Sequence, residues 1–147
     1  MTTASLCGPI CGAPLFVHVF GSTVLVGGVA TVVLLAFAAL RRPEHAGLLR
    51  RLAFGTTLVV VWPGFVVMRI GAQWVLNHEG LDQNTPDWAG IGFAVSDAGI
   101  IVLALITLLA WLAPRRPRAG SILAGLATLY LFALGVAWFY MSAKPGS

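Results

Sequence analysis

The sequence has very little charge. Nine Lys or Arg and five Asp or Glu stand among its 147 residues, so that 10% of the chain is charged and 59% is hydrophobic. A soluble domain carries about 25% charged residues, because its surface has to be solvated. The mean hydropathy is +0.91. This composition excludes an ordinary soluble domain and indicates a polytopic membrane protein.

The motifs of common soluble enzymes are also missing. The sequence contains no glycine-rich nucleotide motif, no H-E-x-x-H and no G-x-S-x-G. It has no pair of carboxylates placed for hydrolysis. Catalysis of these soluble types is therefore excluded, and whether the chain is an enzyme of another kind stays open.

Four long apolar runs occupy most of the chain. They cover about residues 15–40, 52–76, 91–113 and 121–141. Each exceeds the roughly 20 residues that a helix needs to cross the hydrocarbon layer of a bilayer. The alternation expected of barrel strands is not seen. We therefore predict an all-α membrane protein, a four-transmembrane-helix bundle that forms a single integral membrane domain over residues 1–147.

The basic residues predict the orientation. Seven of the nine Lys or Arg lie in residues 41–51 and 114–118. Because Lys and Arg are retained on the cytoplasmic side, these segments are predicted to be cytoplasmic loops of a multi-pass plasma (inner) membrane protein, with the N- and C-termini outside. Attraction to an anionic leaflet accounts for the arginines, so the expected partner is the lipid bilayer and no nucleic acid. A membrane-protein partner or a homo-oligomer stays open.

Three ionisable residues, His18, Arg69 and Asp97, lie inside the apolar runs. Such groups cost a few kcal/mol in lipid, so each is a functional candidate that needs a partner. At 1.5 Å per residue from the arginines of the basic loops, Arg69 and Asp97 lie roughly 27 Å up their helices and His18 roughly 34 Å up its own. We therefore predict that the three converge in the outer leaflet as a small polar site, with Arg69 and Asp97 as an ion pair.

Two interpretations of these residues stay open. Arg69 and Asp97 form either a structural ion pair that fixes helix register or part of a cofactor site, in which Arg69 would face a haem propionate. His18 either hydrogen-bonds to water at the headgroup level or ligates haem iron or a metal ion through its neutral imidazole. If His18 ligates haem iron, Met68 is one residue that could supply the second axial ligand.

The only two cysteines, Cys7 and Cys11, precede the first apolar run. An external compartment permits a disulfide between them. The same pair, together with His18, could hold a soft metal ion such as Cu(I). A single C-x-x-x-C does not separate these alternatives, so a disulfide, idle thiols and a metal site all stay open.

The stretch FVHVFGSTVLVGGVATVVLLAF, residues 16–37, resembles the first helix of a bacterial membrane superfamily, with His18 followed by Gly27 and Gly28. LLRRLAFGTTLVVVWPGFVVMRIGAQW, residues 48–74, is similar to its next helix. The superfamily includes the copper-resistance protein D type, the HemJ-type protoporphyrinogen oxidases and a four-helix family of integral membrane proteins of unknown function. The resemblance implies a four-helix bundle in which His18 is the candidate haem or metal ligand.

The leading functional prediction follows from the polar site. We expect the site to bind haem b or another redox ligand. The alternatives are a non-catalytic accessory or scaffold subunit of a membrane complex, and a copper-handling membrane protein.

Overall fold

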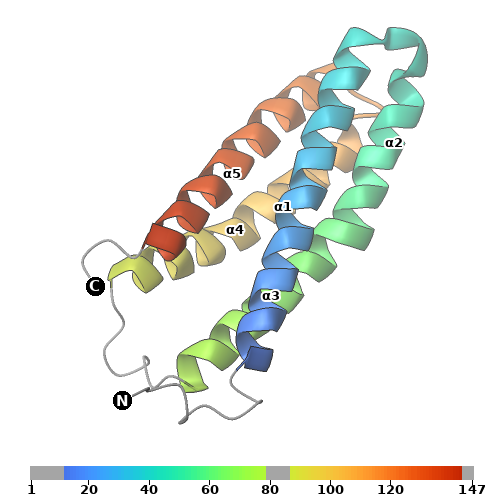
Figure 1. Ribbon diagram of the computed structural model, residues 1–147. Helices are drawn as coiled ribbons and strands as arrows, with labels where there is room; N and C mark the ends of the chain where they lie inside the picture. The colour runs from blue at the N-terminus through green and yellow to red at the C-terminus, as the bar shows by residue number, and fades with distance from the viewer. Residues whose placement is uncertain (1–11, 79–86, 144–147) are drawn as a thin grey trace, which may run out of the picture.

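The computed structural model describes residues 12–78 and 87–143, which are helical apart from short turns (Figure 1). The elements in chain order are α1 (Gly12–Arg41), the 3₁₀ turn η2 (Pro43–His45), α2 (Ala46–Thr56), the π-helical segment η3 (Thr57–Val61), α3 (Trp62–His78), α4 (Asp87–Leu112) and α5 (Pro117–Ala143). In the described ranges, four helical stretches are long and apolar enough to cross a membrane: Gly12–Arg41, Pro43–Asn77, Gly90–Leu112 and Pro117–Ala143. The predicted all-α bundle with four spans is confirmed.

The two basic segments are shorter as loops than predicted. Helix α2 begins at Ala46, so Arg50 and Arg51 lie on a helix and the prediction of a loop over residues 41–51 is wrong beyond residue 45. Leucine and arginine are good helix formers, which favours an early start. Helix α5 begins at Pro117, a residue favoured at the first helical position, so the predicted loop over residues 114–118 ends at residue 116.

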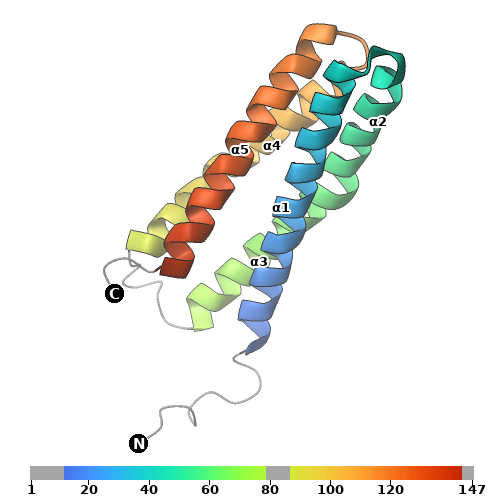
Figure 2. The same cartoon turned by 45° about the horizontal axis from the view of Figure 1, so that its top comes forward.

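Both basic segments lie at one end of the bundle, which we call the basic end (Figures 1 and 2). Arg50 connects them, because its Nη1 donates a hydrogen bond to the carbonyl oxygen of Ala113 at 3.1 Å. This carbonyl belongs to the unsatisfied C-terminal turn of α4, where a cation is favoured. The arginine therefore caps one helical hairpin from the other.

The bundle is apolar both inside and outside. Its centre is filled by aliphatic side chains that are almost fully buried: Leu25, Val29, Val32, Val61, Leu103, Ile106 and Leu123. Large apolar side chains are also exposed around the outside, among them Leu34, Val59 and Phe132. Such a surface suits lipid rather than water.

Helix α1 packs closely against η3 and α3 at four glycines, and we call this contact the α1–α3 seam. The antiparallel register places His18 opposite Gly71, Gly21 opposite Met68, Leu25 opposite Gly64, and Gly28 opposite Val61. A Cβ atom added at Gly21 would lie 2.6 Å from the Cα of Met68, and one at Gly64 would lie 2.8 Å from the backbone nitrogen of Leu25. Small residues permit this approach in membrane helices, and each helix supplies two of them, seven residues apart.

A π-helical turn, η3, ends two residues before Pro63. Proline has no N–H group and cannot continue the regular hydrogen-bond ladder. The N–H of Trp62 instead bonds to the carbonyl oxygen of Thr57, five residues back. The wider turn keeps Thr57 and Val61, four residues apart, on the buried side of the helix.

Candidate functional site

His18 lies in the second turn of α1, and its ring is held by α3. Its Nδ1 is 3.1 Å from the carbonyl oxygen of Met68. A carbonyl oxygen can only accept a hydrogen bond, so Nδ1 carries the proton and donates it. In the neutral imidazole the other nitrogen, Nε2, is then left with its lone pair available. This arrangement, in which Nδ1–H bonds to a backbone carbonyl, is common for histidines that bind metals.

The α1–α3 seam explains how His18 reaches this carbonyl. Opposite Gly71, the backbone of His18 approaches so closely that an added Cβ atom would lie 2.6 Å from the Cα of His18. One turn further along α1, Gly21 admits the backbone of Met68 in the same way. The hydroxyl of Ser22 donates to the carbonyl oxygen of His18 at 2.8 Å. Glycines therefore fix the position of the imidazole through its backbone.

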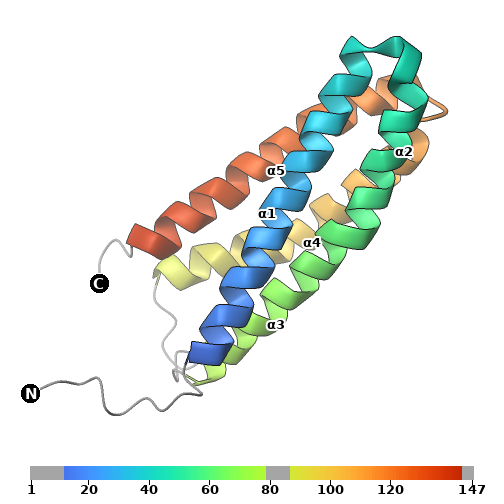
Figure 3. The same cartoon turned by 45° about the vertical axis from the view of Figure 1, so that its right-hand side comes forward.

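A cavity of about 380 Å³ lies beside His18. Its lining residues come from α1, α3, α4 and α5, toward the end where α1 begins and α5 ends. Figure 3 shows the ribbons of these four helices at this end. We call this the open end. Most lining residues are apolar: Leu15, Val19, Leu25, Val26, Met68, Ala72, Val75, Leu76, Gly92, Phe93, Val95, Leu134, Ala137, Trp138 and Met141. Size and composition are those of a small-molecule site.

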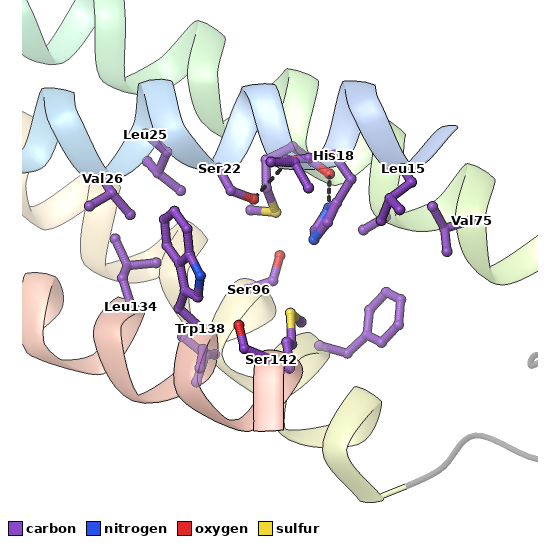
Figure 4. Close-up of a pocket in the computed structure, with 18 of the residues that line it drawn as sticks. Leu15, His18, Ser22, Leu25, Val26, Val75, Ser96, Leu134, Trp138 and Ser142 are labelled. Carbon is purple, nitrogen blue, oxygen red and sulfur yellow. Dashed lines mark hydrogen bonds between the residues drawn. The ribbon is translucent and has the colours of Figure 1, made fainter. Parts of the chain in front are cut away.

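A few polar groups face this apolar cavity. His18 projects into it from α1, while Ser96 and Ser142 point toward the same space from α4 and α5 (Figure 4). Two thioethers, those of Met68 and Met141, also belong to the lining. Gly92 provides room for the side chain of Met141, because a Cβ atom there would overlap its terminal methyl group. The lining therefore contains one imidazole, two thioethers and three serine hydroxyls, of which that of Ser22 donates to the carbonyl oxygen of His18.

Arg69 and Asp97 form an ion pair, with Nη2 and Oδ1 2.7 Å apart. The same guanidinium lies over the ring of Phe93, 5.0 Å from its centroid, and its Nη1 is 3.4 Å from the hydroxyl of Ser96. Phe93 and Ser96 both line the cavity. Arg69 thus reaches from α3 across to α4 and holds two wall residues of the cavity from outside.

The predicted polar site is therefore divided. Within the described part of the chain, the cavity lining includes His18 but neither Arg69 nor Asp97. The Asp97 side chain is 61% exposed, so the pair lies on the flank of the bundle. Counting residues predicts the height of a side chain along its helix but not the direction in which it points around the helix axis. For this reason, the three residues were predicted to form one site. Arg69 faces Asp97, so the geometry gives no support for its contact with a haem propionate.

We predict that the ion pair and the contacts around it stabilise the bundle unequally. Arg69→Gln is expected to lower the free energy of unfolding more than Asp97→Asn, because Arg69 also contacts Phe93 and Ser96. In a double-mutant cycle, the coupling between the two changes should be about 1 kcal/mol, the upper value for partly exposed pairs. Unfolding in mixed detergent micelles measures it. Additive effects of the two substitutions would contradict the pairing.

The sequence analysis missed several residues of the site. Ser96 precedes Asp97 directly and shares its level, a signal that could have been used. Trp138 and Met141 lie on the last apolar run. This run has no charged residue that would indicate which of its faces points into the bundle. A contact outside the cavity lining was missed as well: Trp62 donates from Nε1 to the hydroxyl of Thr107 at 3.0 Å and connects α3 to α4. A lone threonine in an apolar run gave no indication of this bond.

The predicted metal ligands are Cys7, Cys11 and His18, and only His18 lies among the described residues. Cys7 and Cys11 lie outside the described residues, so their disulfide or metal role stays a prediction. Among residues 12–78 and 87–143, no three His, Cys, Asp or Glu side chains come together as a metal-binding group. A metal centre built on such a cluster therefore has no support in this part of the chain, whereas a single axial histidine needs no cluster.

Comparison with known proteins assigns no family to this chain. The resemblance to the copper-resistance protein D and HemJ-type superfamily stays a prediction that rests on the residues around His18. No protein-family model, curated protein or solved structure matches this chain.

Proposed function

We propose that this chain is a four-span protein of the plasma (inner) membrane that binds a flat, mostly apolar redox ligand, with haem b as the first candidate. The basic end faces the cytoplasm, because seven arginines gather in its two short connecting segments and in the first turns of the helices that follow them. The open end, with His18 and the cavity, then lies in the outer leaflet.

The orientation of the His18 imidazole is the observation that carries this proposal. Nδ1 is committed to the carbonyl oxygen of Met68, and the ring belongs to the cavity lining. A histidine at a solvated headgroup surface would not need a fixed ring. A ring held in one tautomer beside an apolar cavity is suited to bind a ligand atom through the lone pair of Nε2.

Three residues of the cavity lining carry donor atoms that would hold haem b through its iron. His18 supplies an imidazole, and Met68 and Met141 each bring a thioether to the same lining. Histidine with methionine is an established axial pair for electron-transfer haems. Haem b, when bound, would supply one-electron chemistry at its iron. The protein would orient the imidazole of His18, surround the porphyrin with apolar side chains and exclude water.

The test is an absorption spectrum of the purified protein. We expect protein in mild detergent, titrated with haemin, to bind one haem per chain and to show Soret and α bands in the reduced-minus-oxidised spectrum. No bands from a protein with an intact helical circular-dichroism spectrum would reject haem. A quinol titrated in parallel would then distinguish another redox ligand, bound by Nε2 as a hydrogen-bond acceptor, from a scaffold subunit with no ligand.

A further inference from the structure

A groove lies at the basic end, on the surface of the α1–α2 hairpin. This groove has a volume of about 670 Å³. It is lined by Leu34, Phe37, Ala38, Arg41, Arg42, His45, Leu48 and Leu49. It is remote from His18, because Leu34, its first lining residue on α1, lies 16 residues further along the helix, roughly 24 Å at 1.5 Å per residue.

The groove is basic at one end and apolar along its walls. Arg41 closes α1 and Arg42 forms the turn, so two guanidinium groups stand where the helix leaves the apolar span. Leu34 lies seven residues earlier, roughly 10 Å deeper in the membrane at 1.5 Å per residue. The nearby carboxylate of Glu44 belongs to the same turn, yet no acidic side chain is among the lining residues that the structure describes.

This combination matches the two halves of a phospholipid. Guanidinium groups bind phosphate oxygens with two parallel hydrogen bonds. Basic pockets between membrane helices at the cytoplasmic side recognise anionic headgroups. Leu34 and Leu48 are 70% and 61% exposed, which leaves apolar surface for acyl chains directly below the arginines.

We propose that the α1–α2 groove binds an anionic phospholipid of the inner leaflet. Arg41 and Arg42 hold the headgroup phosphate, and the acyl chains lie along Leu34, Phe37 and Leu48. Free phosphate shares the headgroup chemistry but would make no use of the apolar walls. This site is independent of the ligand proposed for the His18 cavity.

Native mass spectrometry of the detergent-purified chain tests the proposal with phosphatidylglycerol and phosphatidylcholine of the same acyl chains. We expect phosphatidylglycerol to bind more tightly. The double variant Arg41→Gln and Arg42→Gln should lose about 25-fold in affinity, from roughly fivefold for each arginine near an anionic headgroup. The matched control is Arg116→Gln with Arg118→Gln, which removes the same charge at the same end of the bundle and should retain wild-type affinity.

Three further measurements separate the sources of binding. Ala38→Trp leaves the charge unchanged and fills the groove, so it should also weaken phosphatidylglycerol binding even if the double arginine variant fails to fold. Glycerol 3-phosphate and inorganic phosphate, which lack chains, should not compete at concentrations similar to those of the lipid. Equal binding of both lipids, equal losses in the two double variants, or competition by free phosphate would each overturn the proposal.

Discussion

Replacing Gly71 by alanine is expected to destabilise the bundle and to displace His18. The new Cβ atom would lie 2.6 Å from the Cα and 3.0 Å from the Cβ of His18, and closer still to its backbone nitrogen. Because these atoms are mainly backbone, no side chain can turn aside to make room. Helices α1 and α3 would have to separate at the point where the hydrogen bond from His18 to Met68 is made.

We expect Gly71→Ala to lower the free energy of unfolding by about 3 kcal/mol, the upper part of the range for overpacked sites. Denaturation in mixed micelles, followed by circular dichroism, measures this loss. Nitrogen-15 labelling of histidine supplies a second readout, since the Nδ1-protonated tautomer of His18 should no longer dominate once its carbonyl partner has moved away.

Gly27→Ala is the matched control for this substitution. Gly27 lies on α1 and is exposed, and a Cβ atom added there meets nothing within 4 Å. Alanine is the better helix former by about 0.5–1 kcal/mol, so this variant should be as stable as the wild type or slightly more stable. Equal stability of the Gly71 and Gly27 variants would show that the α1–α3 seam is less tightly packed than described.

The architecture was predictable because a single physical requirement dominates it. A backbone in hydrocarbon has to satisfy its own hydrogen bonds, so four apolar runs of sufficient length predict four helices. The ends of the helices were less predictable, because arginine and leucine next to Pro43 and Pro117 suit a helix as well as a loop. The sequence signals of a loop, charge and proline, are therefore also those of a first helical turn.

The site was predictable only in part. Charge in an apolar run identified His18, Arg69 and Asp97, and counting residues gave heights that agree with the observed ion pair. The direction in which each side chain points depends on how the helices pack, and that packing depends on uncharged residues such as Gly71 and Gly92. Glycine occurs at 17 positions, so no single glycine identifies a contact without the structure. The cavity could not be derived from the sequence for this reason.

His18 is the residue whose replacement should have the largest effect on ligand binding. His18→Ala removes both nitrogens of the ring, and we expect the affinity for haem to fall at least about 100-fold, which corresponds to about 2.7 kcal/mol. Spectrophotometric titration of the detergent-purified variants measures this loss. His45→Ala, which removes an exposed histidine at the basic end, should leave the affinity unchanged.

His18→Asn separates the two nitrogens of the ring. The asparagine amide can still donate to the carbonyl oxygen of Met68, as Nδ1 does at 3.1 Å, but it offers no nitrogen lone pair to iron. If Nε2 is the ligand atom, this variant should keep nearly wild-type stability and lose binding as fully as His18→Ala. If the Asn variant binds haem like the wild type, the imidazole is not a ligand and its hydrogen bond serves only to join α1 to α3. Stability and binding therefore vary separately in this variant, which is why it tests the role of His18 more sharply than alanine does.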